Sequence, residues 1–337
     1  MGKAGRILRA VEMPRSLARR AFRIALFLAL LASLLARGDT ETIEIDVDGL
    51  DRTALVHVPE GVAPGERLPL ILAFHGSALN GRTMEEITGF SDLADREGFV
   101  VVYPNGSGPS GVLSWNAGSC CSFALERNID DLAFVDALLD TLIERYPVDT
   151  TRIYATGFSN GGMLTYALAI ETPERFAAIA VVSGAMFASQ GPADEPLPVL
   201  IIHGTDDAVI PYVGGWGALR TLSGKTEPAL PAAEAAAFWI ANNGCKDVAI
   251  STTSERNAQI RRYSGCRDDT DVVFITLLEG PHGWPVIADN PDTFLLSEDA
   301  VSIFSGMTDG EIPWDLFEIG LDATQTIWEF FEAHGRR

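Results

Sequence analysis

The sequence predicts an α/β fold in which a mostly parallel central sheet is flanked by helices on both faces. Several short segments are almost continuously apolar, such as residues 68–75 (LPLILAFH), and continuous apolarity indicates a strand that is covered on both faces. These segments alternate with longer stretches of helical spacing, which is typical of parallel strands joined by crossover helices. Ligands bind such sheets at the carboxyl ends of the strands, so the functional residues are expected there.

The elements follow in chain order. Residues 42–47 and 54–58 alternate apolar and polar side chains around Asp48-Gly49, which predicts a hairpin. Further strands are expected at residues 68–75, 99–103, 152–156, 176–183, 199–203, 258–263 and 271–278. Helices are expected over residues 81–96, 128–146, 163–171, 232–242 and 322–333. The long loop from residue 104 to about 127 is expected to be functional, because loops of that length without a function are uncommon in compact domains.

The first 38 residues differ from the rest. They hold eight Lys or Arg residues and one acid, Glu12, around an apolar run at residues 24–36. That run is too short to span a bilayer comfortably, but it suits the core of a secretory signal. The sequence therefore predicts export to the extracellular or periplasmic space and no stable membrane span after signal removal, with residues 39–337 as a single domain. An uncleaved anchor or a cytosolic amphipathic helix is the alternative for the leader.

The formal net charge of −21 disfavours nucleic acid and anionic membranes as partners. Four cysteines in an exported chain indicate disulfides, and their spacing gives no metal ligand set, so neither a metal nor a cofactor is expected. Of the three possible connectivities, Cys245 with Cys266 is favoured because it closes a local loop. Cys120 and Cys121 are then a vicinal pair or free thiols.

Residues 157–162 (GFSNGG) lie between an expected strand and an expected helix. This is the context of a nucleophile elbow, in which a strained turn exposes a serine, here Ser159, at the top of the sheet. Glycines two residues before and after the serine prevent clashes with the strand and the helix. A bare G-x-S-x-G also occurs in ordinary Gly-Ser turns, so the assignment depends on the partners of Ser159.

Two other strand ends supply those partners. Asp206 and Asp207 follow the strand at 199–203, where a tandem Asp could also cap a turn, and His282 follows the strand at 271–278. Ser, Asp, His is the chain order of the α/β-hydrolases. The oxyanion donors are expected to be the backbone N–H of Asn160 and that of Ser77 or Ala78, although the loop at 75–81 could be a plain strand-to-helix turn.

These residues resemble the secreted esterase family that groups feruloyl esterases with poly(3-hydroxybutyrate) depolymerase-like enzymes, which have the α/β-hydrolase fold. The matching stretches include FHGSALNG (74–81), SWNAGSCC (114–121), YPVDTTRIYATGFSNGGMLTYALA (146–169), HGTDDAVIPY (203–212), PHGWP (281–285) and DATQTIWEFF (322–331). In the family pattern the acid is the second of the two aspartates, which implies Asp207. Pro281 in place of a glycine is a departure, and residues 286–321 fit the pattern poorly.

The resemblance implies a catalytic domain that acts as a serine carboxylic ester hydrolase, with Ser159, Asp207 and His282 as its triad. The leading hypothesis is release of hydroxycinnamoyl or acetyl groups from plant polysaccharide. Depolymerisation of a polyester is the alternative, disfavoured because no separate binding module or Ser/Thr-rich linker is visible. A serine peptidase or a catalytically silent binding protein represents other classes. Trp115 and Trp284 are expected to stack on an aromatic acyl group or a sugar, unless they are buried loop anchors.

Overall fold

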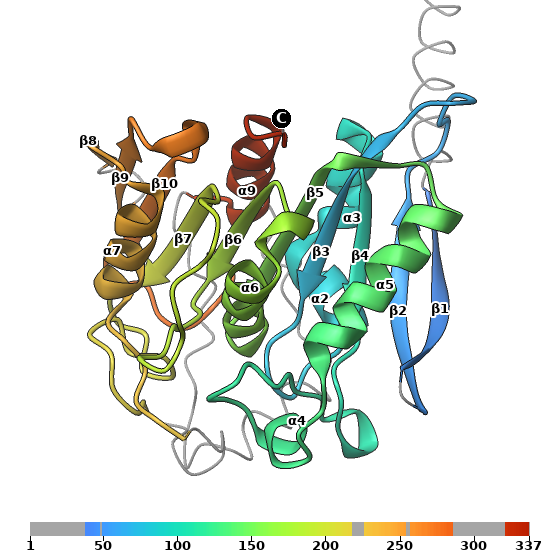
Figure 1. The fold of residues 1–337 in the computed structure, drawn as a ribbon, viewed down its shortest axis with the longest axis horizontal. Coiled ribbons are helices and arrows are strands. Elements are labelled where there is room, and N and C mark those ends of the chain that lie inside the picture. Colours follow the sequence, from blue (N-terminus) through green and yellow to red (C-terminus); the bar gives the residue numbers. More distant parts are fainter. Residues whose placement is uncertain (1–37, 48, 218–225, 254–256, 286–320, 337) are drawn as a thin grey trace, which may run out of the picture.

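The structure, a computed structural model, describes residues 38–47, 49–217, 226–253, 257–285 and 321–336 (Figure 1). The predicted export segment and most of residues 286–321 lie outside them. The strands are β1 (Asp39–Val47), β2 (Leu50–Val58), β3 (Leu68–Phe74), β4 (Val100–Pro104), β5 (Val148–Phe158), β6 (Ala178–Val182), β7 (Val199–Gly204), β8 (Asp247–Thr253), β9 (Ala258–Ser264) and β10 (Val272–Leu277). The helices are α2 (Gly81–Thr88), α3 (Phe90–Glu97), α4 (Ser122–Glu126), α5 (Asp131–Arg145), α6 (Asn160–Glu171), α7 (Ala232–Asn243) and α9 (Ala323–Glu332).

All the described strands belong to one sheet, in the order β1-β2-β4-β3-β5-β6-β7-β10-β9-β8. The central strands, from β4 across to β10, run parallel to one another. β1 and β2 extend one edge in antiparallel fashion, and β9 and β8 extend the other. The carboxyl ends of β3, β5, β7 and β10 therefore lie at the same edge of the sheet, where the sequence predicted the chemistry.

Helices cover both faces of the sheet, as predicted (Figure 1). The side chains of α5, α6 and α7 form one apolar core with one face, around Phe134, Leu164 and Trp239. Those of α2, α3 and α9 form a second core with the other face, around Phe90 and Phe331. Among the described residues no helix combines the length and the apolar character needed to cross a bilayer.

Three elements differ from the prediction, one of them the short helix α4, which lies inside the stretch expected to be a loop. The helix expected over residues 81–96 is two helices, because Gly89 adopts a left-handed conformation (φ 62°) that ends α2 before α3 begins. β8 was not predicted at all. Among the described strands it lies at the edge of the sheet and pairs with β9, and its Val248 and Ile250 side chains are 55% and 61% exposed. An exposed strand lacks the apolar pattern that reveals a buried one.

A buried ion pair joins the antiparallel edge to α5. Arg52 of β2 donates to the Asp131 carboxylate at 2.7 Å and to the Asn105 carbonyl at 3.1 Å, and its guanidinium lies 4.0 Å from the centre of the Phe134 ring. Burial raises the pKa of Asp131 even though the Arg52 charge opposes that shift. The other Asp131 oxygen accepts the backbone N–H of Asn116 at 2.7 Å. The pair therefore anchors the loop at residues 113–121 to the body of the domain.

We predict that Arg52→Ala lowers the free energy of unfolding by about 3–5 kcal/mol, because it leaves the Asp131 carboxylate buried without its cation. The measurement is equilibrium unfolding in denaturant. Arg336→Ala is the matched control, since the Arg336–Glu195 pair has side chains 35% and 52% exposed and should contribute less than about 1 kcal/mol. Equal losses in the two variants would contradict this role of the buried pair.

Candidate active site

The elbow is built where β5 ends and α6 begins. Ser159 has φ 55° and ψ −118°, and its N–H donates to the Val182 carbonyl at 3.0 Å. A Cβ on Gly157 would lie 2.3 Å from the backbone of Gly161, and one on Gly161 would lie 2.2 Å from the Phe74 carbonyl oxygen. The two glycines are therefore required by close backbone approach, and Ser159 is held in the strained conformation of a nucleophile elbow.

The structure brings the three predicted triad residues together. His282 Nε2 lies 3.0 Å from Ser159 Oγ, and His282 Nδ1 lies 2.8 Å from Asp207 Oδ2. Because the carboxylate can only accept, the Nδ1–H donates to it, which leaves Nε2 free to accept the Ser159 hydroxyl proton. The imidazole ring also lies 4.9 Å from the Phe158 ring. This is the geometry that a serine nucleophile, a general base and an orienting acid require.

The two tandem aspartates have different environments. Asp207 is 3% exposed, and its Oδ1 accepts the backbone N–H groups of Val209 at 2.9 Å and Ile210 at 2.7 Å. Burial alone would raise the pKa of Asp207, but the nearby imidazoles of His282 and His203 outweigh it and hold that pKa below its ordinary value. Asp206 is exposed, and its carboxylate accepts the Thr205 hydroxyl at 3.2 Å. The geometry therefore supports Asp207 as the acid.

His203 lies beside Asp207, although the sequence analysis assigned it no role. Its Nε2 lies 2.8 Å from the Ile210 carbonyl oxygen and 3.4 Å from Asp207 Oδ2. The Nε2–H thus donates to the carbonyl and also lies close to the same carboxylate oxygen that accepts from His282. The spacing in the sequence could have indicated this contact. His203 lies at the end of a predicted strand, four residues before Asp207, and a turn after the strand can bring the two side chains together.

The candidate oxyanion donors lie on either side of Ser159. Asn160 is the first residue of α6, so its N–H has no carbonyl partner inside the helix. In the facing loop the Ala78 N–H donates to the Leu113 carbonyl at 2.8 Å, and no hydrogen bond of the Ser77 N–H is found within the described residues. Of the two N–H groups considered from the sequence, Ser77 is therefore the one available.

The expected stacking role of Trp115 and Trp284 is wrong. Trp115 is 0% exposed and donates from its indole Nε1–H to the His75 carbonyl at 2.9 Å. Trp284 is 4% exposed and donates to the Thr324 hydroxyl at 3.0 Å. Both rings fill the protein interior because their N–H groups find buried acceptors there, and a buried ring has no face to offer a substrate. They are the loop anchors that the alternative described.

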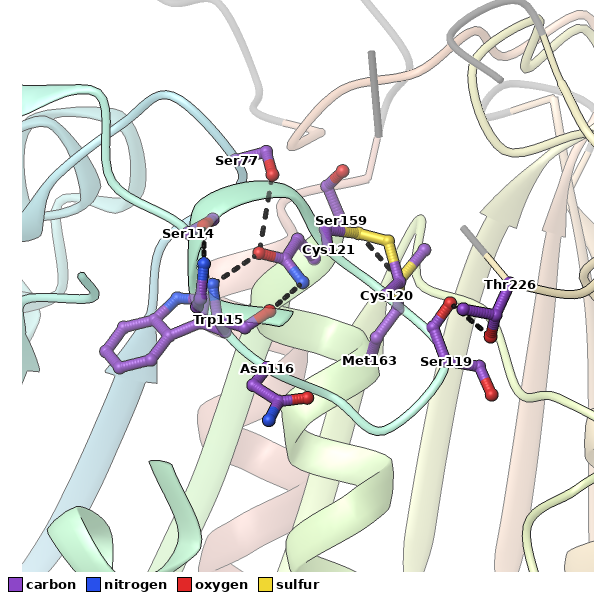
Figure 2. Close-up of a disulfide and its surroundings, with 12 residues drawn as sticks. Ser77, Ser114, Trp115, Asn116, Ser119, Cys120, Cys121, Ser159, Met163 and Thr226 are labelled. Carbon is purple, nitrogen blue, oxygen red and sulfur yellow. Dashed lines mark hydrogen bonds between the residues drawn. A yellow bond between two sulfur atoms is a disulfide. The ribbon is translucent and has the colours of Figure 1, made fainter. Parts of the chain in front are cut away.

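The described cysteines form two disulfides. One joins Cys245 to Cys266 between the end of α7 and the turn after β9, and the other joins the neighbours Cys120 and Cys121. Cys121 Sγ lies 3.9 Å from Met163 Sδ in the first turn of α6 (Figure 2). The vicinal pair is thus part of the surroundings of the elbow, which the sequence did not predict.

His75, which begins the oxyanion loop, is fully buried and held in one tautomer. Its Nδ1–H donates to the Gly76 carbonyl at 2.7 Å, and its Nε2 accepts the Gly106 N–H at 3.0 Å. Burial lowers the pKa of His75 to about 4, with the Arg52 charge acting in the same direction. Protonation at Nε2 would break the bond from Gly106, so the neutral ring is the structural form.

We predict that the free energy of unfolding falls as the pH drops from 6.5 toward 4. The unfolded chain binds a proton at His75 near pH 6.5, whereas the folded chain binds it only near about 4, so stability is lost across that window. Full loss amounts to about 3 kcal/mol. His75→Gln, which can still accept from Gly106, should flatten the slope in denaturant titrations at several pH values. An unchanged slope would show that another group is responsible.

We predict that Asp207→Asn lowers kcat on an ester by about 10⁴-fold, because an amide at this position can hold His282 in the wrong tautomer. Asp206→Asn is the matched control and should leave kcat within about threefold, since its carboxylate is exposed. Steady-state kinetics of the two variants measures the difference. Similar losses in both would mean that the acid has been misassigned.

Comparison with known proteins supports this description. The family model described as esterase PHB depolymerase matches residues 53–210, which include the elbow and both aspartates. The chain is 28% identical to a probable feruloyl esterase C of Aspergillus terreus over 276 residues, 78% of this chain and 90% of that protein. It is 34% identical over 164 residues to a bifunctional acetylxylan esterase/xylanase of Neocallimastix patriciarum, 49% of this chain but 22% of that larger protein.

Among solved structures, an acetyl xylan esterase from Aspergillus awamori matches with a TM-score of 0.51 and 17% identity. The match covers 74% of this chain and 96% of the other, and at this identity it concerns the fold. The resemblance drawn from the motifs is therefore confirmed: this protein has the α/β-hydrolase fold and is similar, through the segment that carries Ser159, to the esterase PHB depolymerase family.

Proposed function

We propose that this protein is a serine carboxylic ester hydrolase that releases hydroxycinnamoyl or acetyl groups from plant polysaccharide through an acyl-enzyme. The observation that carries the proposal is the hydrogen-bonded series from Ser159 through His282 to Asp207, with distances of 3.0 and 2.8 Å. It lies at the strand ends where an α/β-hydrolase binds its substrate. Relatives named feruloyl and acetylxylan esterases support the choice of ester.

In this mechanism the Ser159 hydroxyl attacks the ester carbonyl while His282 Nε2 accepts its proton. Asp207 stabilises the imidazolium through the Nδ1–H, and the N–H groups of Asn160 and Ser77 donate to the oxyanion of the tetrahedral intermediate. His282 then returns the proton to the leaving alkoxide, and the alcohol departs. Water, activated by the same imidazole, attacks the acyl-enzyme, releases the carboxylic acid and regenerates Ser159.

Export is a part of the proposal. A basic leader with an apolar run precedes the domain, and disulfides persist in oxidising compartments. Residues 39–337 then act as one catalytic domain outside the cytosol, where polysaccharide esters would be encountered. An acidic chain also stays soluble there without binding nucleic acid or anionic membranes.

A panel of esters tests the function. We expect turnover of methyl ferulate or of acetylated xylan, and slower turnover of a hydroxybutyrate oligomer and of a peptidyl amide, measured as initial rates with the purified protein. Preference for the oligomer would replace the proposal with a polyester hydrolase. Cleavage of the amide alone would indicate a peptidase.

Ser159→Ala is the control for the panel. It should abolish turnover of every ester and leave the melting temperature nearly unchanged, because it removes a hydroxyl without changing the backbone. Residual turnover in this variant would mean that another group performs the reaction. Labelling of Ser159 by a fluorophosphonate, detected in the intact protein, checks the nucleophile independently of the ester chosen.

A further inference from the structure

We propose that the side-chain amide of Asn160 is a positioning group that holds the two oxyanion donors in register, and that the Cys120–Cys121 disulfide supports it. The proposal rests on the proposed esterase function. It concerns the Asn160 side chain, which is distinct from the backbone N–H assigned above to the oxyanion.

The amide joins the elbow to two separate loops. Asn160 is 1% exposed, and its Oδ1 accepts the backbone N–H of Trp115 at 2.8 Å while its Nδ2 donates to the carbonyl of the same residue at 3.1 Å. Oδ1 also accepts the Ser77 hydroxyl at 3.4 Å. One side chain thus contacts both the residue that carries the second oxyanion donor and the loop beside it. Figure 2 draws Ser77 and Trp115, which are labelled, with the dashed hydrogen bonds that reach them.

The loop held by Asn160 in turn fixes the oxyanion loop. The Leu113 carbonyl, two residues before Trp115, accepts the Ala78 N–H at 2.8 Å. The Trp115 indole donates to the His75 carbonyl at 2.9 Å. The segment from His75 to Ala78 is therefore tied at both ends to residues 113–115, and those residues are tied through the Asn160 amide to the residue after the nucleophile.

The loop that contains Trp115 also contains the vicinal disulfide. The Trp115 carbonyl that accepts from Asn160 also accepts the Cys121 N–H at 2.9 Å, and the Ala117 N–H donates to the Cys120 carbonyl. Cys121 Sγ contacts Met163 on α6 at 3.9 Å. The loop from Trp115 to Cys121 thus closes on itself and lies against the helix whose first residue is Asn160 (Figure 2).

This arrangement has a direct consequence for catalysis. The two proposed oxyanion donors follow different strands, Ser77 after β3 and Asn160 after β5, so their separation depends on the contacts that link these two segments. Donors stabilise the transition state only when they are held in advance at hydrogen-bond distance from the developing charge. The Asn160 amide is the polar link between them. Its loss should therefore affect the chemical step more than substrate binding.

The test is the Asn160→Ala variant, which removes the amide but keeps the backbone N–H. On p-nitrophenyl acetate we expect kcat, normalised to the active fraction by burst titration, to fall about 10- to 100-fold, with KM changed less than about threefold. Asn116→Ala is the matched control. Its amide holds the same loop through Ile129 and Gly118 but does not reach the elbow, so kcat should stay within about threefold. Unchanged kcat in Asn160→Ala, or equal losses in both variants, would overturn the proposal.

Two further experiments distinguish failure of the disulfide's role from failure of the proposed esterase function. The double variant Cys120→Ser/Cys121→Ser should lower kcat in the same direction, and an unchanged kcat would remove the disulfide from the proposal. If the wild-type protein hydrolyses no ester, the proposed function fails, and the rate of Ser159 labelling by a fluorophosphonate replaces kcat as the readout. Slower labelling of Asn160→Ala than of Asn116→Ala would then still support the positioning role. Equal rates, or no labelling of the wild type, would overturn it.

Discussion

The backbone of Ser159 is the constraint on which the rest of this structure depends. A left-handed residue between β5 and α6 is strained, and it persists only where the neighbouring chain fits closely around it. Gly157 and Gly161 allow that fit because their missing side chains let strand and helix backbones touch. The turn fixes Ser159, the proposed nucleophile, and at the same time places the N–H of Asn160 at the free start of a helix.

Several polar side chains are buried around this turn. Each of them is less than 5% exposed and is hydrogen-bonded to the backbone of a loop that follows a strand: Arg52, His75, Asp131 and Asn160. A buried polar group without a partner destabilises the fold by more free energy than its hydrogen bond contributes when it is made. The loops that supply these partners can therefore take few other conformations. The same network that satisfies the polar groups therefore restricts the positions of Ser77 and Asn160, the proposed oxyanion donors.

The burial of Trp115 and Trp284 removes the two aromatic side chains that were expected to contact the substrate. Neither ring is available to stack on a ferulate or a sugar, so aromatic recognition by these residues does not distinguish a feruloyl from an acetyl substrate. The two proposed acyl groups rest on the names of the relatives, because the catalytic machinery is common to both reactions. Selection of the acyl group must then come from the shape of the site around Ser159 rather than from these two tryptophans.

The sequence by itself determined the fold class, the buried strands, the elbow and the histidine, because continuous apolar runs and a glycine-flanked serine have local physical causes. It missed β8, whose exposed side chains leave no pattern. Only the tertiary structure showed that Asp207 is buried beside His282 whereas Asp206 is exposed, buried the tryptophans, and joined Asn160 to Ser77 and the disulfide loop. Those outcomes depend on contacts between residues dozens of positions apart, which no local pattern encodes.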